Sequence, residues 1–381
     1  MKKGILQGLK MILALAIGGA IGLSIALLFT GTSVNEFITK FARVNWGEML
    51  GVCLFSILCA GIALGTHTIL HEAGHLIAGL MSGYKFLLFR IGSLTIIQSD
   101  GKFHLKKFPL EGTAGQCLMI PPQLPIEKIP TKLYNLGGIL VNLLCSAIAL
   151  IIALTSSNVW VIIASFLFTL IGLLLAALNG IPVKIGGLSN DGKKVQYLDK
   201  DILSKKAFVN QLMVHALTQQ DTRPRDIPDE YLTFVTDIDY KDALQVNWLL
   251  MSAVTLIDRR EYEASYKILD SIIQHENKVL GVFIKETKCE LVFVSLITGR
   301  TDRAIQLYTD EIATYAQQYH TTMSGKLRLL CAIAYYIEKN TQKAQLLQEQ
   351  IQANRNKYLM QGEVVMDIDL IDEILSNKNQ S

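Results

Sequence analysis

Long apolar runs occupy the chain up to residue 182, and the remainder is mixed in charge and rich in helix-forming residues. Four of the runs reach the roughly 20 residues that a helix needs to cross a bilayer. They cover approximately residues 11–30, 49–80, 133–154 and 159–178. This pattern predicts a mainly α, polytopic membrane protein with about four transmembrane helices and a polar helical region behind them.

The first run follows Lys2, Lys3 and Lys10, as the apolar core of a signal peptide would. It is longer than the usual core of about 7–15 residues, and no A-x-A cleavage pattern follows it. We therefore expect a retained N-terminal anchor. Together with the external loop behind it, the anchor makes up a first region, residues 1–47.

The lysines and arginines of the short loops set the expected orientation in the membrane. Three precede the first run, two lie in the loop 31–47, seven lie in 81–132, none lies in 156–158, and three follow soon after the fourth run. Positive loops stay in the cytosol, so the N-terminus, the loop 81–132 and everything beyond residue 182 are expected there. The expected location is a cell membrane, namely a bacterial plasma membrane.

A hairpin signal lies between the second and third apolar runs. Within residues 84–108, two β-prone runs rich in aromatic residues flank Ser99-Asp100-Gly101-Lys102. A D-G turn between such runs predicts a β-hairpin. We expect His104, on its second strand, to be a surface residue.

The polar tail contains an internal repeat. Ala264, Ala304 and Ala344 are spaced by 40 residues, each near a helix start where alanine suits a tight crossing. The tail resembles tetratricopeptide repeats lengthened beyond their usual period of about 34 residues. Residues 196–381 are therefore expected to form a cytosolic helical-repeat domain. Its concave face could bind a peptide or protein partner, or the domain could only pack against the membrane region.

The composition agrees with a membrane protein and argues against other classes. Of all residues, 50% are hydrophobic and 18% are charged, and the mean hydropathy is +0.33. The net charge of +3 is too small to indicate nucleic-acid binding, and no basic cluster with interleaved aromatic residues is present. The six cysteines form no C-x-x-C pair, so neither a disulfide scaffold nor a cysteine zinc site is expected.

The second apolar run contains His71-Glu72-x-x-His75. Histidines at i and i+4 lie on one helix face, so both rings can reach one zinc ion. Glu72 lies about 100° further round the helix, where it can contact a metal-bound water and act as general base. Polar side chains in an apolar span are costly unless something binds them, so the motif predicts a zinc site rather than a chance match.

The motif is expected near the cytosolic end of its span, because the 20 residues from Gly51 to His71 rise about 30 Å in a helix. His67 lies one turn before His71 on the same face. It is either a packed, hydrogen-bonded histidine or a group that supports the ligands from behind.

A third ligand must come from another element at the same depth. Asn179 and Pro182 end the fourth run, and a glycine-rich turn then leads to Asp191-Gly192 on the cytosolic side. Asp191 would complete a His2Asp set with an open fourth position, as a catalytic zinc site requires. An ordinary D-G turn explains the same two residues, and the shared depth favours a ligand.

These motifs together resemble the site-2 protease family of intramembrane zinc metalloproteases, over about residues 48–195. His71-Glu72-x-x-His75 matches the first motif of that family. The segment GILVN, from Gly138 to Asn142, matches the second motif, G-x-x-x-N/S/G. The resemblance makes residues 48–195 the expected metalloprotease core.

The third motif of the family, N-x-x-P followed by D-G, is similar to Asn179, Pro182, Asp191 and Gly192. Nine positions separate Pro182 from Asp191, more than is usual in the family, so the insert must loop back for Asp191 to reach a metal. The resemblance implies His71, His75 and Asp191 as the ligands of one zinc ion and Glu72 as the base. The residues that it implies in substrate binding or support of the site are Gly138, Asn142, Asn179, Pro182 and Gly192.

The resemblance also implies a role for the hairpin of residues 84–108. Members of the family carry a hairpin there that dips into the membrane beside the active site. A substrate helix must unwind before it is cut, and an exposed strand edge offers the freed backbone groups new partners. The alternative is a cytosolic hairpin with no part in catalysis.

The expected function is therefore an intramembrane zinc metalloendopeptidase that cuts membrane-embedded peptides or proteins near the cytosolic face. Signal-peptide remnants, pheromone or bacteriocin precursors and membrane-tethered regulators all suit such a site. The alternative is a catalytically silent membrane receptor or immunity-type scaffold that retains the motif. A zinc transporter is disfavoured, because further intramembrane carboxylates or histidines that would form an ion path are lacking.

Overall fold

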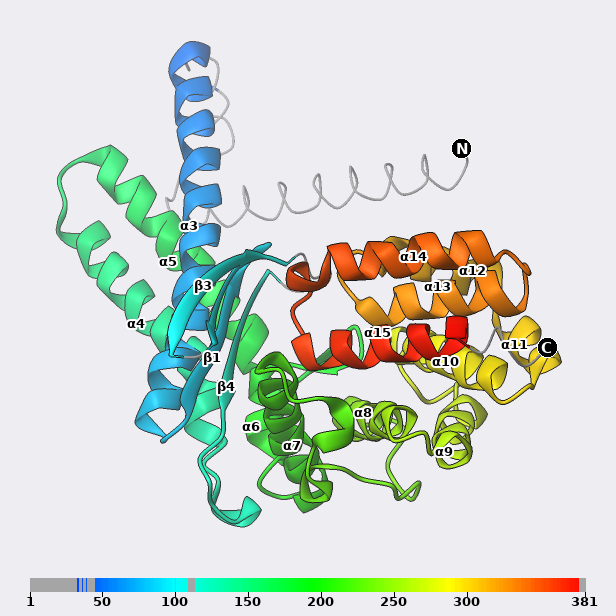
Figure 1. Cartoon of the computed structure of the whole chain (residues 1–381). Coiled ribbons are helices and arrows are strands. Elements are labelled where there is room, and N and C mark those ends of the chain that lie inside the picture. The colour runs from blue at the N-terminus through cyan, green and yellow to red at the C-terminus, as the bar shows by residue number, and fades with distance from the viewer. Residues whose placement is uncertain are drawn as a thin grey trace. The chain divides into compact units, whose positions relative to one another are not determined.

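The structure, a computed structural model, describes residues 33, 36, 39, 45–99, 101–108 and 114–376 (Figure 1). The chain divides into two compact units, Met1–Gly61 and Ile62–Ser381. The first predicted span, residues 11–30, lies outside the described residues. All the chemistry considered below lies in the second unit.

Three described helices are long and apolar enough to cross a membrane. They are α3 (Trp46–Met81), α4 (Lys132–Thr155) and α5 (Val159–Gly180), and they confirm the helices predicted at 49–80, 133–154 and 159–178. Asn158 caps α5, where its side chain accepts hydrogen bonds from the backbone N–H groups of Trp160 and Val161. Leucine and isoleucine side chains are widely exposed on these helices, as in a protein embedded in lipid.

Small residues bring α3 and α4 into backbone contact. A Cβ atom added at Gly74 would lie 2.3 Å from the carbonyl oxygen of Gly137, and one added at Gly137 would lie 2.2 Å from that of Gly74. Only glycine at both positions permits this approach. The contact sets α4 directly against the part of α3 that carries His71 and His75.

A four-stranded antiparallel sheet follows α3, with strand order β3-β2-β1-β4. The strands are β1 (Lys85–Ile91), β2 (Leu94–Ser99), β3 (Lys102–Lys107) and β4 (Gly115–Ile120). The pairing of Ser99 with Lys102 confirms the predicted hairpin, and His104 is exposed as expected. The first β-prone run is two strands rather than one, because the positive φ of Gly92, 58°, makes a second tight turn. Strand β4 has no counterpart among the predictions.

The described chain beyond β4 is mainly helical and includes one further, two-stranded sheet. Two 3-10 turns interrupt the helices, η2 (Pro224–Asp226), which begins with a proline, and η3 (Asp229–Tyr231), which follows Pro228. The remaining elements are η1 (Ile126–Lys128), β5 (Lys184–Ile185), β6 (Leu188–Ser189), α6 (Asp191–Tyr197), α7 (Ile202–Gln219), α8 (Ala243–Asp258), α9 (Tyr262–Gln274), α10 (Gly281–Ile297), α11 (Thr301–Leu307), α12 (Asp310–Tyr319), α13 (Ser324–Tyr336), α14 (Thr341–Ala353), η4 (Arg355–Lys357) and α15 (Gln361–Ser376).

The same left-handed turn precedes α9, α11 and α14. Its positive-φ residue is Arg260, Gly299 or Lys339, so the spacing is 39 and then 40 residues. Ala304 and Ala344 are fully buried after their turns, as predicted. The corresponding prediction for Ala264 is wrong, because Ala264 is exposed and its neighbour Ser265 is buried. Because Arg260 and Gly299 are 39 rather than 40 residues apart, the small buried residue of α9 is Ser265 instead of Ala264.

Candidate metal centre

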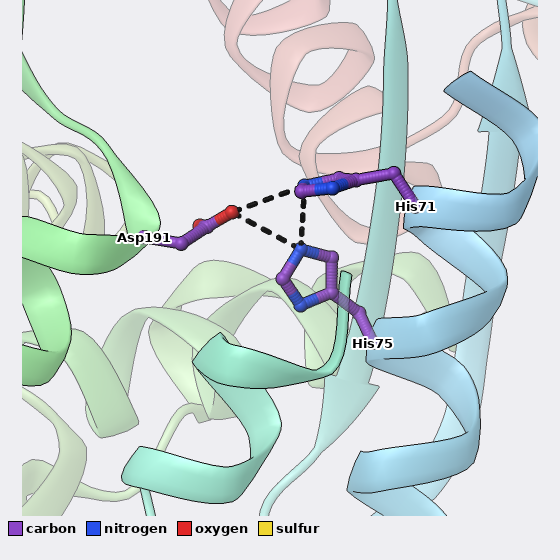
Figure 2. Close-up of side chains that lie close together, drawn as sticks. All are labelled: His71, His75 and Asp191. Carbon is purple, nitrogen blue, oxygen red and sulfur yellow. Dashed lines mark hydrogen bonds and ion pairs between the residues drawn. The ribbon is translucent and has the colours of Figure 1, made fainter. Parts of the chain in front are cut away.

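His71, His75 and Asp191 come together from α3 and the first residue of α6 (Figure 2). The Nε2 atoms of the two histidines lie 3.1 Å apart, and Asp191 Oδ2 lies 3.1 Å from His71 Nε2 and 3.2 Å from His75 Nε2. In a tetrahedral zinc site with bonds of about 2.0–2.1 Å, neighbouring ligand atoms lie about 3.3 Å apart. The three atoms are therefore close enough to hold one metal ion. A tetrahedral ion with three protein ligands has a fourth position for water.

Asp191 reaches the histidines because the insert before it folds into a small hairpin. Strands β5 and β6 pair, and the turn between them uses positive φ angles of 57° and 87° at Gly186 and Gly187. The nine-residue step from Pro182 to Asp191 required the chain to fold back, and this hairpin does so. It directs the chain from the end of α5 to the start of α6.

Asn190 fixes the end of this loop. Its side chain donates hydrogen bonds of 2.7 Å to the carbonyl oxygens of Leu178 and Ile181 and accepts one of 2.9 Å from the N–H of Lys193. It is therefore both the N-cap of α6 and a tie to the end of α5. Gly192 completes the junction, because a Cβ atom there would lie 2.0 Å from the carbonyl oxygen of Gly180.

Asp191 is held in its ionised form. Its side chain is only 13% exposed, and Lys194 Nζ lies 3.3 Å from its second oxygen, Oδ1. Burial alone would raise the pKa of Asp191, but the ammonium of Lys194 and the two histidines hold that pKa well below its usual value. One oxygen thus faces a lysine while the other faces the histidines as a potential ligand.

The proton on His75 is located by the backbone of α4. His75 Nδ1 lies 2.7 Å from the carbonyl oxygen of Tyr134, which can only accept a hydrogen bond. Nδ1 must therefore carry a proton. In a neutral imidazole, Nε2 then has a free electron pair, and this atom is the one that faces His71 and Asp191.

The proton on His71 is located through two further buried side chains, Asn142 and His67. His67 Nε2 lies 3.0 Å from the carbonyl oxygen of Phe168, so Nε2 must donate and Nδ1 of a neutral His67 must accept. One end of the Asn142 amide lies 3.2 Å from His67 Nδ1, and the other end lies 3.4 Å from His71 Nδ1. In the structure the amide oxygen Oδ1 faces His67 and the nitrogen Nδ2 faces His71. A neutral His67 that donates from Nε2 can only accept at Nδ1, so we assign the reversed amide orientation, in which the NH2 faces His67 and donates to it.

The carbonyl end of the Asn142 amide consequently faces His71 Nδ1, which must donate to it. His71 Nε2 then has a free electron pair, like His75 Nε2. A doubly protonated His67 would also satisfy the contacts, but only as an unpaired charge on a side chain that is 0% exposed, at a cost of several kcal/mol or more.

Two nitrogen electron pairs and one carboxylate oxygen therefore converge within about 3 Å of one another. Such groups repel one another unless a cation lies between them. A single proton can bridge two of the three atoms, whereas a metal ion can bind all three. The hydrogen-bond network thus leaves three atoms that could bind one metal ion together.

His67 is a buried, hydrogen-bonded histidine, as one of the two interpretations expected, and Asn142 links it to His71. Gly172 makes room for it, since a Cβ atom there would lie 2.3 Å from His67 Cε1. Gly138 plays the same part for the ligand itself, because its Cβ atom would lie 2.5 Å from two atoms of the His71 ring. The Gly138 and Asn142 pair predicted on α4 thus meets His71 and its hydrogen-bond network.

Replacing His67 by leucine should weaken metal binding. The Asn142 amide would lose its acceptor and no longer hold the His71 proton on Nδ1. Changes to groups that orient ligands typically lower metal affinity about 10- to 100-fold. Competition with a chromophoric chelator measures the affinity, and the exposed His104→Leu variant is the control. Equal zinc affinities in the two variants would contradict the network.

Glu72 lines the same cavity of about 550 Å3 as the three potential ligands, and it packs against the start of β4. A Cβ atom at Gly115 would lie 2.7 Å from Glu72 Cγ and 2.9 Å from Glu72 Oε1. The absence of a side chain at residue 115 therefore leaves the space in which the carboxylate lies.

Gly115 also marks where the edge of the sheet meets the cavity. Within the described part of the chain, β4 pairs with β1 alone, so no described strand lies along its other edge. The Gly92 N–H donates a hydrogen bond to the carbonyl oxygen of Ala114. Along an antiparallel strand, successive residues point their N–H and C=O groups to opposite sides, so the N–H and C=O of Gly115 point away from β1. The strand beside the site is thus β4, and not the hairpin predicted within residues 84–108, whose strands lie further along the sheet.

A Gly115→Ala substitution should displace Glu72. Catalytic groups that move by about 1 Å can lose about 100-fold in rate, so peptide cleavage should fall by about that factor while metal content is unchanged. Gly65→Ala is the matched control, because a Cβ atom there meets no atom within 4 Å. Equal cleavage by the two variants would show that Gly115 does not position Glu72.

The remaining predicted positions have more distant roles. Asn179 lines the cavity, but its amide donates to the carbonyl of Leu175 in its own helix, at 3.0 Å. Pro182 is exposed after the end of α5 and does not line the cavity. Four positions were missed: Tyr134, Gly115, Lys194 and Asn190. Only Asn190 carried a usable signal, as an asparagine before a helix start.

No protein-family model, no curated protein and no solved structure matches this chain.

Proposed function

We propose that this protein is an intramembrane zinc metalloendopeptidase of the site-2 protease type, which cuts membrane-embedded peptides or proteins near the cytosolic face. The observation that carries the proposal is the convergence of His71 Nε2, His75 Nε2 and Asp191 Oδ2 beside Glu72, inside a largely apolar cavity. The three apolar helices support the membrane location.

The chemistry needs one metal ion, which we propose to be zinc, held by the three converging atoms. Bound zinc polarises a peptide carbonyl and lowers the pKa of water. Histidine nitrogens and a carboxylate oxygen form a typical ligand set for zinc. Lys194 balances Asp191 from the side away from the histidines.

Glu72 carries the proton transfers. It takes a proton from the attacking water and returns it to the amine that leaves when the C–N bond breaks. Its carboxylate is not among the three converging atoms, so it is free for this role. The free edge of β4 at Gly115 suits a substrate backbone that has unwound from its helix, because it can pair with an extended chain.

We further infer that the N-terminus and the region beyond α5 are cytosolic, and that α8–α15 form a helical-repeat domain that binds a peptide or protein partner. The lysines around the spans support the orientation. The recurring left-handed turn before α9, α11 and α14 supports the repeat.

Cleavage in a defined bilayer tests the proposal. The purified full chain is placed in liposomes with a synthetic transmembrane peptide, and the products are identified by mass spectrometry. We expect cuts within the apolar segment that stop with a zinc chelator and return when zinc is added. A zinc-loaded protein that cuts none of a panel of such peptides would instead favour the catalytically silent receptor or scaffold.

A further inference from the structure

A second cavity, of about 330 Å3, lies inside the helical region beyond the metal centre. Residues of α7, α8, α10, α13 and α15 line it. Each of these helices contacts the next one in that order, and α15 contacts α7, so the five helices close around the cavity. Figure 1 shows α15 running beside α13 and α14, where it completes this ring.

Most of the cavity wall is apolar. The side chains that form this part include Leu250, Met251, Val254, Val282, Phe283 and Met366. Val282, at the start of α10, is also 47% exposed, so the wall reaches the molecular surface there. Cavities of about 300–1,000 Å3 with apolar walls and a few polar groups are typical of ligand sites.

The polar part of the wall holds more negative than positive groups. Lys326 Nζ lies 2.6 Å from Glu286, and Arg328 pairs with Glu290, so these four groups balance in two pairs. Two further carboxyls of α15, Glu363 and Asp367, line the same cavity.

Asp367 and Glu363 are incompletely matched by cations. Asp367 is 0% exposed, and its carboxylate lies 3.3 Å from Arg328 Nη1 and interacts with the Ser324 hydroxyl, but neither contact is a well-aligned hydrogen bond. No lysine or arginine of the described residues lies within ion-pair distance of Glu363. Burial raises the pKa of Asp367 to about 6 and that of Glu363 to about 8.

The other titratable groups that face the cavity do not supply the missing positive charge. Burial lowers the pKa of His215, on α7, to about 4, so its ring is neutral, and Nδ1 has no hydrogen-bond partner among the described residues. The hydroxyl of Tyr315, on α12, donates to Glu286. Neither group offsets the carboxyls of α15.

We propose that this cavity binds an apolar peptide segment that carries one positive charge, as a lysine side chain or an N-terminal ammonium. An ammonium group would be matched by Glu363 and Asp367, while aliphatic side chains would cover the apolar wall. An anion would add to the excess of negative charge, and a neutral apolar ligand would leave both carboxyls unmatched. This inference does not depend on the proposed protease activity.

Two matched probes test the charge requirement, acetyl-Leu-Lys-Leu-amide and acetyl-Leu-Gln-Leu-amide. They are titrated calorimetrically into the full chain in neutral detergent, in the Glu72→Gln background so that neither is cut. We expect saturable binding of the lysine probe, at least about tenfold tighter than that of the glutamine probe. Because ionised Glu363 favours the cation, its binding should tighten about tenfold between pH 6 and pH 9, where lysine stays charged.

Two variants locate the binding. Glu363→Gln should weaken binding of the lysine probe at least about tenfold and remove its pH dependence above about pH 7, where Asp367 is already ionised, whereas Glu349→Gln, at an exposed glutamate of α14, should change neither. Met251→Trp, which fills the cavity without a change of charge, should also weaken binding. Equal affinities for the two probes, unchanged binding in Glu363→Gln, or no saturable binding at concentrations up to about 10 mM would each overturn the proposal.

Discussion

The Glu72→Gln variant is expected to lose cleavage of a transmembrane peptide while it keeps its metal. Glutamine has the shape of glutamate but cannot take a proton from water at neutral pH. A positioned general base and acid contributes about 10²–10⁴-fold to a rate, so cleavage should fall by at least about 10²-fold. Glu72 Oε1 would still fit beside Gly115, because the substitution changes no side-chain volume appreciably.

The matched control is Glu48→Gln, at the start of α3, which changes the same atoms far along the helix from the motif. Both variants should contain as much zinc as the wild type, because Glu72 is not one of the three converging ligands. A Glu72→Gln protein that cuts at the wild-type rate would rule out a proton-transfer role for Glu72. A variant that loses its zinc would instead make Glu72 a ligand.

The Asp191→Ala variant should lose the metal and, with it, cleavage. Two histidines remain, and Lys194 would then lie near the vacated position with no carboxylate to balance it. We expect zinc affinity to fall by at least about 100-fold, more than the loss expected for His67, which acts only through a ligand. Metal content after dialysis against a weak chelator measures the change.

Asp191→Asn is measured together with Asp191→Ala. It keeps the size and shape of the side chain at the start of α6 and removes only its charge. Asp199→Asn is the control, since Asp199 pairs with Lys132 and Lys205 and faces no histidine. If Asp191→Asn and Asp199→Asn bound zinc equally well, Asp191 would not be a ligand.

Features that depend on local periodicity could be predicted from the sequence. The apolar runs defined the three described spanning helices to within a few residues, and the i, i+4 spacing placed His71 and His75 together. Asp191 was a weaker prediction, because the course of the β5–β6 loop depends on Gly186, Gly187 and the bonds of Asn190 to the end of α5.

Contacts between residues that lie far apart in the sequence could not be predicted. Strand β4 becomes the edge beside Glu72 only through its pairing with β1, and nothing near Gly115 in the sequence indicates that it must leave room for a carboxylate. The same holds for the link from Phe168 through His67 and Asn142 to His71, which joins three helices. A one-residue difference between repeats likewise moved the buried position from Ala264 to Ser265.

The polar groups of the apolar core share one physical explanation. Each buried polar side chain in these helices would be costly in lipid without partners. Hydrogen bonds link His67 to Asn142 and to a backbone carbonyl, Asn142 to His71, and His75 to a second backbone carbonyl. With these bonds made, His71 Nε2, His75 Nε2 and Asp191 Oδ2 carry no proton. A metal ion bound between these three atoms would complete the network.

The most direct test is the metal content of the purified full chain, measured by inductively coupled plasma mass spectrometry together with that of Asp191→Asn. We expect about one zinc ion per wild-type chain and far less in the variant. A wild-type protein that binds no zinc after exposure to it, or that holds the same amount as the variant, would contradict the metal centre and the protease mechanism built on it.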